Sequence, residues 1–134
     1  MSNYEPITSM ELEKCHVILL RENLVENKMK EGVHIEVQDV SLIKHANKTI
    51  TAGRSYAVLV SSSDFNSVSD DARKLSASPE FVERTVAKAL LVHNTATKLV
   101  GNTYILVNRP AIPTRMFTCR EEAIGWLEEK LKEQ

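Results

Sequence analysis

Two largely apolar runs limit what this chain can fold into more than any other feature of its sequence. They span residues 56–60 (YAVLV) and 86–92 (VAKALLV). A largely apolar run indicates a strand buried on both faces, which is typical of parallel sheets covered by helices. Because the segments around these runs have helical patterns, strands and helices alternate along the chain. The sequence therefore predicts an α/β domain with a mostly parallel sheet and right-handed crossovers.

The N-terminal half contains two further candidate strands and one amphipathic helix. Residues 15–20 are rich in leucine and β-branched side chains. Residues 24–30 alternate only weakly with a period of two, which places this second strand nearer an edge. From Glu36 the period becomes helical, and Gly53 is a suitable residue to follow the last turn. The apolar side of this helix consists of Val37, Val40, Ile43, Ala46 and Ile50.

A second helix is predicted to begin at Ser69. A serine at the N-cap can accept a hydrogen bond from a free backbone N–H, and the carboxylates of Asp70 and Asp71 suit the positive end of the helix dipole. Further on, the Ser-Pro-Glu sequence at residues 78–80 is a standard helix opening. We therefore expect a separate short turn of helix at residues 81–84.

The region after the second apolar run leaves two alternatives open. Residues 103–107 alone have the composition of a strand, whereas the apolar positions across residues 94–108 also fit one face of a helix. A short strand is predicted at residues 114–117. Thr118 and Glu121 then have the spacing of a capping box, which predicts the start of a C-terminal helix.

The chain reads as one domain preceded by a short arm. Its 134 residues are enough for a single core. Residues 1–14 are polar and form the predicted N-terminal arm, and residues 15–134 form the predicted domain. The element order is β-β-α-β-α-β-α-β-α, with an antiparallel edge strand in an otherwise mostly parallel sheet.

Charge and composition exclude several classes of function. The net charge is −1, without the basic excess that nucleic-acid binding requires, so we expect a protein or small-molecule partner and no nucleic acid. No apolar run approaches the ~18 residues of a membrane span, and residues 1–14 lack the features of a signal peptide. We therefore expect a cytoplasmic protein, and a homodimer is the default expectation for its assembly.

Motifs that would fix a reaction are missing. The four histidines and two cysteines have no metal-ligand spacing, and the four glycines do not form a phosphate-binding loop. We therefore expect no metal, no cofactor and no catalytic constellation. The sequence favours a binding module over an enzyme.

With this element order, the chain resembles the STAS or anti-sigma-factor-antagonist family. It is most similar to the small bacterial STAS-like proteins of unassigned function, which have a SpoIIAA-like fold. The segments that carry the resemblance are residues 56–60 (YAVLV), 68–73 (VSDDAR), 87–92 (AKALLV), 108–117 (NRPAIPTRMF) and 122–127 (EAIGWL). The resemblance covers the chain from Cys15 onward and implies a helix over residues 94–107, as the crossover between the last two strands.

The resemblance also implies a function. In STAS proteins the helix after the central strand carries an Asp-Ser-Ser-Gly signature, its second serine can be phosphorylated, and its N-terminus docks partner proteins. Here the matching residues are Ser69, Asp70, Asp71 and Ala72. The phosphorylatable position falls on an aspartate, so the resemblance implies a regulatory protein-binding module without the usual phosphorylation switch.

The predicted partner-binding surface lies at the carboxyl ends of the strands, where open parallel sheets meet their ligands. It comprises Ser62, Asp64, Ser69, Asp70, Asp71 and Arg73. Taken by themselves, the residues around Ser69 are better explained by helix capping, and only their location favours a functional surface. A small-molecule or lipid-binding module using the same edge is the alternative function.

Two further candidates lie near the C-terminus. Arg109 and Arg115 flank a proline-stiffened loop and could clamp an anion, although pairing with nearby acids on a solvated loop is the favoured explanation. Cys119 lies beside Arg120 at a helix start, where thiol pKa values are lowered, and it is a candidate reactive thiol. A cysteine-dependent enzyme built on Cys119 is the remaining alternative, although a partly packed structural cysteine is the simpler interpretation.

Overall fold

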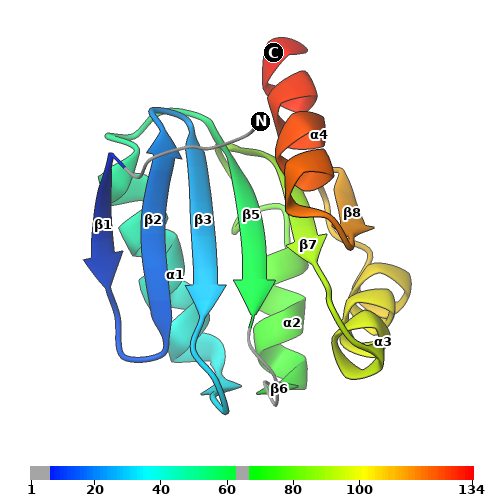
Figure 1. Ribbon diagram of the computed structural model, residues 1–134. Helices are drawn as coiled ribbons and strands as arrows, with labels where there is room; N and C mark the ends of the chain where they lie inside the picture. The colour runs from blue at the N-terminus through cyan, green and yellow to red at the C-terminus, as the bar shows by residue number, and fades with distance from the viewer. Residues whose placement is uncertain (1–6, 63–66) are drawn as a thin grey trace.

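A six-stranded sheet forms the centre of the protein (Figure 1). The computed structural model describes residues 7–62 and 67–134, without the side chains of residues 96 and 97. In spatial order the strands are β1 (Thr8–Glu11), β2 (Cys15–Arg21), β3 (Leu24–Met29), β5 (Tyr56–Ser62), β7 (Thr85–Leu91) and β8 (Thr114–Phe117). Two short strands, β4 (His34–Ile35) and β6 (Ser67–Val68), pair separately.

Five helical segments connect and cover these strands. They are α1 (Val37–Ile50), α2 (Asp70–Ala77), α3 (Thr95–Thr103), the π-helix η1 (Tyr104–Asn108) and α4 (Arg120–Lys132). Helices α1 and α2 lie behind the sheet in Figure 1, whereas α4 lies in front of it. Within residues 7–62 and 67–134, none of the helices is long and apolar enough to cross a membrane.

The strand directions confirm the predicted fold class. The pairs β3–β5, β5–β7 and β7–β8 are parallel, while β1–β2 and β2–β3 are antiparallel. The sheet is therefore mostly parallel with antiparallel strands at one edge. Within the stretch predicted as an N-terminal arm, Thr8–Glu11 is that edge strand, since its backbone pairs with β2.

The predicted position of the second strand is wrong. Its weak alternation placed it nearer an edge, but β3 lies inside the sheet between β2 and β5. The polar residues that weakened the pattern, Glu26 and Asn27, are nevertheless buried. Each has a hydrogen-bonded partner on a different element, which offsets the cost of burying a polar side chain.

Side chains of the central strand β5 alternate between two cores. Ala57 and Leu59 pack in the core beneath α4, which includes Ile124 and Leu127. Val58 lies in the core beneath α1 on the opposite face. The apolar run thus supplies both faces of the sheet, as predicted for a strand that is covered on both sides.

Two predicted helix starts differ from the structure. Residues 79–84 form turns and not a helix; Arg84 adopts a left-handed backbone (φ 70°), which is incompatible with continuing a helix and leads the chain into β7. The predicted capping box at Thr118 is also wrong. Helix α4 has Cys119 as its N-cap, without a side-chain cap, and Arg120 is its first residue.

Two other helix predictions are confirmed. The Ser69 side chain caps α2 by accepting a hydrogen bond from the backbone N–H of Ala72 at 3.1 Å. The ambiguous segment after β7 is helical, as the family resemblance implied. Its last turn widens into the π-helix η1, a form that is rare and often found at functional sites.

Candidate functional site

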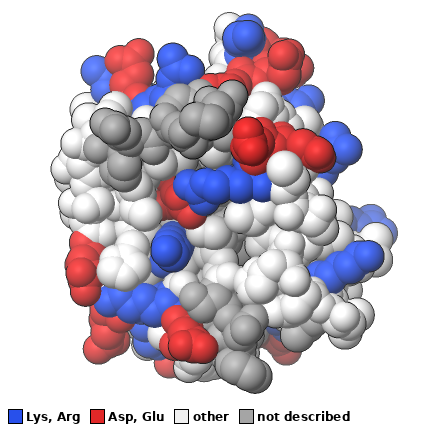
Figure 2. Space-filling model, viewed as in Figure 1, with Lys and Arg blue, Asp and Glu red and all other residues white. Residues whose placement is uncertain are grey.

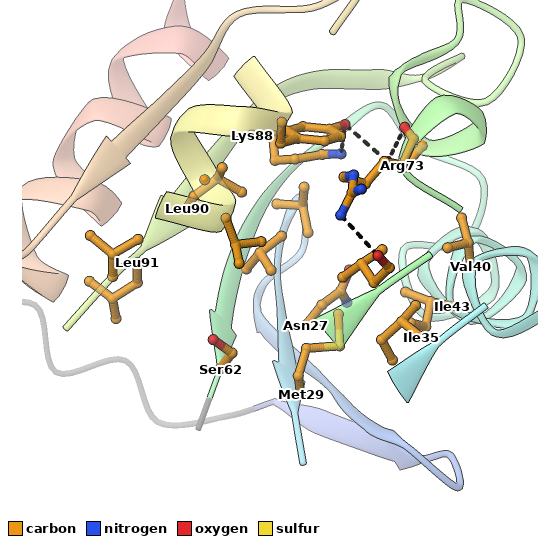
Figure 3. Close-up of a pocket in the computed structure, with 18 of the residues that line it drawn as sticks. Asn27, Met29, Ile35, Val40, Ile43, Ser62, Arg73, Lys88, Leu90 and Leu91 are labelled. Atoms are coloured by element: carbon orange, nitrogen blue, oxygen red, sulfur yellow. Dashed lines mark hydrogen bonds between the residues drawn. The ribbon is translucent and has the colours of Figure 1, made fainter. Parts of the chain in front are cut away.

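An open pocket of about 620 Å³ lies between the sheet and helices α1, α2 and α3 (Figure 3). This volume lies within the range of small-molecule sites, roughly 300–1,000 Å³. Most of the pocket wall is aliphatic, with contributions from the five strands β3 to β7 and from the helices on this face. The aliphatic lining includes Met29, Ile35, Val40, Ile43, Val58, Val60, Val68, Leu90 and Val100.

The pocket exists because the helices do not cover this face of the sheet completely. Val60 of β5 faces the pocket and remains partly exposed, although it lies in the middle of the sheet. At the far side, Gly101 lets α3 approach the sheet, since a Cβ there would lie 2.6 Å from the Met116 sulfur of β8. Beyond Tyr56, the β5 residues that line the pocket are Val58, Val60 and Ser62, whose small or medium side chains leave the space between α1 and α3 open.

Polar groups are concentrated on one part of this apolar wall. Lys88 of β7 is only 8% exposed, and its ammonium group donates to the Tyr104 hydroxyl at 3.0 Å. The Tyr104 hydroxyl lies 3.1 Å from Ser76 Oγ, which is 3.0 Å from the Arg73 carbonyl oxygen. Because that carbonyl can only accept, Ser76 donates to it, and Tyr104 must donate to Ser76.

This chain of hydrogen bonds leaves Lys88 incompletely satisfied. An ammonium group has three N–H donors, and the Tyr104 hydroxyl uses one of them. Lys88 also lies 5.1 Å from the centroid of the Tyr104 ring, a weak cation–π contact. Among residues 7–62 and 67–134, no acidic side chain forms an ion pair with Lys88. A buried cation without an anionic partner is unusual.

A second lysine, Lys44 of α1, has a hydrogen-bond acceptor for each of its three N–H donors. Its ammonium group donates to Tyr56 Oη at 3.0 Å, the Glu83 carbonyl oxygen at 2.8 Å and Thr85 Oγ1 at 2.9 Å. Burial, together with the positive charges of Lys48 and Lys88, lowers the pKa of Lys44 to about 8. Lys44 and Lys88 therefore place two amines near the same pocket, but only the Lys88 amine has donors to spare.

An amide pair joins the pocket floor to α1. Asn27 of β3 and Asn47 of α1 donate to each other's side-chain oxygens at 2.8 and 3.1 Å. Both residues are buried and line the pocket. The reciprocal pair therefore connects α1 directly to the sheet at the floor of the pocket.

The predicted partner-binding residues divide into two groups. Ser62 and Arg73 line the pocket (Figure 3). Arg73 also donates to the Val68 carbonyl oxygen at 2.9 Å and forms an ion pair with Asp70. Asp70 and Asp71 are exposed at the start of α2, outside the pocket lining. Asp64 lies outside the described residues.

The two predicted clamp arginines have different surroundings. Arg115 of β8 lies over the ring of Phe117, 5.0 Å from its centroid. Arg109 has a left-handed backbone (φ 48°) and lines a separate small cavity beside Lys74 and Ser78. Neither forms an ion pair with an acid in the described part of the chain, and their action as a clamp stays a prediction.

The two cysteines are unpaired and differ in burial. Cys15 is completely buried, and burial raises the pKa of its thiol to about 12. Cys119 is partly exposed as the N-cap of α4. Within residues 7–62 and 67–134, His, Cys, Asp and Glu side chains do not gather into a metal-binding group of three.

The opposite face of the sheet carries a buried ion pair. The carboxylate of Glu26 accepts two hydrogen bonds from Arg120, at 2.5 and 2.9 Å, and one from Ser61 at 2.5 Å. Burial alone would raise the pKa of Glu26, but the bonds from Arg120 and Ser61 outweigh burial and lower it below its ordinary value of 4.5. The pair joins the first turn of α4 to the centre of the sheet.

Sequence reasoning missed Lys88, Tyr104 and Ser76, which form the hydrogen-bonded group of the pocket. One signal was available, because Lys88 interrupts an otherwise apolar run that was correctly predicted to be a buried strand. A charged residue buried in such a strand requires a partner or a function. Tyr104 gave no signal, since its segment fitted either a strand or a helix.

Comparisons with known proteins support the fold. No curated protein matches the chain. A solved structure of an uncharacterized protein of the DUF3478 family from Shewanella loihica PV-4, with a SpoIIAA-like fold, matches with a TM-score of 0.51 at 10% identity. The match covers 90% of each chain, and it confirms the predicted SpoIIAA-like fold. A family model for a domain of unknown function matches residues 18–131, and the chain therefore belongs to the DUF7793 family.

Proposed function

We propose that this protein is a binding module for a small, largely apolar molecule, which it holds in the pocket between the sheet and helices α1, α2 and α3. The observation that carries this proposal is the pocket itself, with a volume of about 620 Å³ and a mostly aliphatic wall. Transfer of apolar surface from water into such a site supplies a favourable free energy of about 25 cal/mol per Å². Small-molecule binding was the alternative function that the sequence left open.

A variant that fills the pocket tests this proposal. Val60→Phe adds a ring to the pocket wall, and aromatic residues have a high propensity for strands such as β5. We expect the protein to bind Nile red, an uncharged dye that fluoresces in apolar surroundings, and we expect Val60→Phe to weaken this binding at least about ten-fold. Fluorescence titration at constant ionic strength measures both affinities.

The matched control adds the same ring to the other face of the sheet. Ile18 of β2 packs in the core beneath α4 and does not line the pocket, so Ile18→Phe is expected to leave dye binding unchanged. Thermal unfolding of each variant establishes that it is folded. If the wild type does not bind the dye, or if the two variants bind it equally well, the pocket is not a binding site.

A regulatory protein-binding role is a second proposal, and it rests on the resemblance to STAS proteins. Asp70 and Asp71 are exposed at the start of α2, and Ser69 alone caps the helix, so the cap does not require these carboxylates. We expect Asp70→Lys together with Asp71→Lys to abolish co-purification of a partner from cell extract. A partner retained equally by both forms would contradict docking at this end of α2.

A further inference from the structure

The unsatisfied donors of Lys88 narrow the class of ligand that the pocket can take. A buried ammonium group is costly unless its charge is paired and its N–H groups are hydrogen-bonded. The Tyr104 hydroxyl uses one donor. Figure 3 shows Lys88 and Arg73 extending from β7 and α2 into one part of the pocket, apart from Met29 and Ile35. Two donors of Lys88 therefore remain for a ligand group.

The charge around this part of the chain favours an anion. Among the described residues that line the pocket, the charged side chains are Arg73 and Lys88, and none is Asp or Glu. Figure 2 shows basic side chains along the right-hand edge of the molecule, the side on which β8 and α3 lie in Figure 1. The ammonium group of Lys44 adds a further positive charge. It is close enough to Lys88 for the charge of Lys88 to contribute to lowering the pKa of Lys44. A cation on the ligand would be repelled here, and a neutral head group would leave Lys88 uncompensated.

We infer that the ligand is an amphipathic anion, with a carboxylate or phosphate head bound by Lys88 and an aliphatic tail along the Val60 wall. This inference rests on the proposed small-molecule function and adds the chemistry of the head group to it. The tail lies against the aliphatic side chains of β5 and α1, which cannot satisfy polar atoms. The head pairs with the ammonium group in a site of low polarity, where charge-assisted hydrogen bonds are strong.

Ligands that share one tail and differ only in the head group test the inference. Decanoate, decyl phosphate, decanol and decyltrimethylammonium are used to displace Nile red at pH 7.5, below their micelle concentrations. We expect one or both anions to bind at least about ten-fold tighter than decanol, because hydrogen bonds to charged groups are worth this much. The ranking of decanoate against decyl phosphate identifies the head group.

The variant Lys88→Met keeps the length of the side chain and removes its charge. We expect its anion affinity to fall toward its decanol affinity, so that the preference for anions is lost. Thermal unfolding establishes that the variant is folded. Lys98→Met is the matched control, since it removes the same charge from the exposed surface of α3, outside the pocket lining. It should change the ratio of anion to alcohol affinity less than about two-fold.

The outcomes separate this inference from the proposed function. If decanol binds as tightly as both anions, or if Lys88→Met retains the preference, the pocket binds apolar molecules but Lys88 does not select an anion. If the cationic ligand binds best, the inferred negative charge of the ligand head group is wrong. If none of the four displaces the dye and the dye itself does not bind, the proposed function fails as well.

Discussion

Replacing Arg120 with methionine is expected to lower the free energy of unfolding by about 3 kcal/mol, the lower end of the range for removing one partner of a buried ion pair. The loss follows because Glu26, only 4% exposed, would lose both hydrogen bonds and the positive charge that Arg120 supplies to its carboxylate. Arg120 itself is 44% exposed in its side chain, so water can replace part of the interaction. Urea unfolding at pH 7 measures the change.

A surface ion pair of the same type provides the control. Arg21→Met removes the guanidinium that lies 3.1 Å from Glu128, where the arginine side chain is 55% exposed, and should cost less than about 1 kcal/mol. Glu26→Gln combined with Arg120→Met should recover most of the loss, because no unpaired charge remains buried. If Arg120→Met lowers the free energy of unfolding no more than Arg21→Met does, losing Arg120 does not leave Glu26 as a costly buried charge.

The pH dependence gives this prediction a second readout. Because the pKa of Glu26 lies below 4.5 in the folded protein, its contribution to stability is complete above pH 4.5 and is lost as the pH falls through the folded pKa. Without Arg120, burial dominates and raises the pKa of Glu26, so protonation relieves the buried charge. The stability difference between wild type and Arg120→Met should therefore shrink between pH 7 and pH 3.

Local patterns in the sequence were enough to predict most of the elements. The buried runs that became β5 and β7, and the period of α1, depend on neighbouring residues that a single strand or helix brings together. The predicted position of β3 failed for the opposite reason. Glu26 and Asn27 look like edge residues until their partners on α4 and α1 are known, and Arg120 is 94 residues away from Glu26.

The candidate site was harder to predict than the fold, because a pocket is a space between elements and has no sequence pattern of its own. Its size depends on how far α1 and α3 lie apart over β5, which no local signal records. Lys88 was visible as a charge in an apolar run, but Tyr104 and Ser76 reach it only through the packing of α2 and η1. Of the residues predicted from the sequence, Ser62 and Arg73 line this pocket.

Truncating the side chains of two neighbouring residues of β5 should lower the free energy of unfolding by very different amounts. Leu59→Ala is expected to lower the free energy of unfolding by about 2–5 kcal/mol, since Leu59 is fully buried beneath α4 and its removal leaves a cavity. Val60→Ala should cost only about 1 kcal/mol, because Val60 already faces an open pocket and is partly exposed. Urea unfolding of both variants measures the two free energies of unfolding. They can be compared if the free energy falls with urea concentration at the same slope in both variants.

The difference between these two costs reports on the pocket in solution. If the helices closed over β5 in the free protein, Val60 would be packed as tightly as Leu59, and the two truncations would cost similar amounts. A small cost for Val60→Ala means that the space beside it is open without a ligand, so binding need not separate packed helices. Little of the binding free energy is then spent on rearrangement, and the affinity for an apolar tail can approach the value set by the buried area.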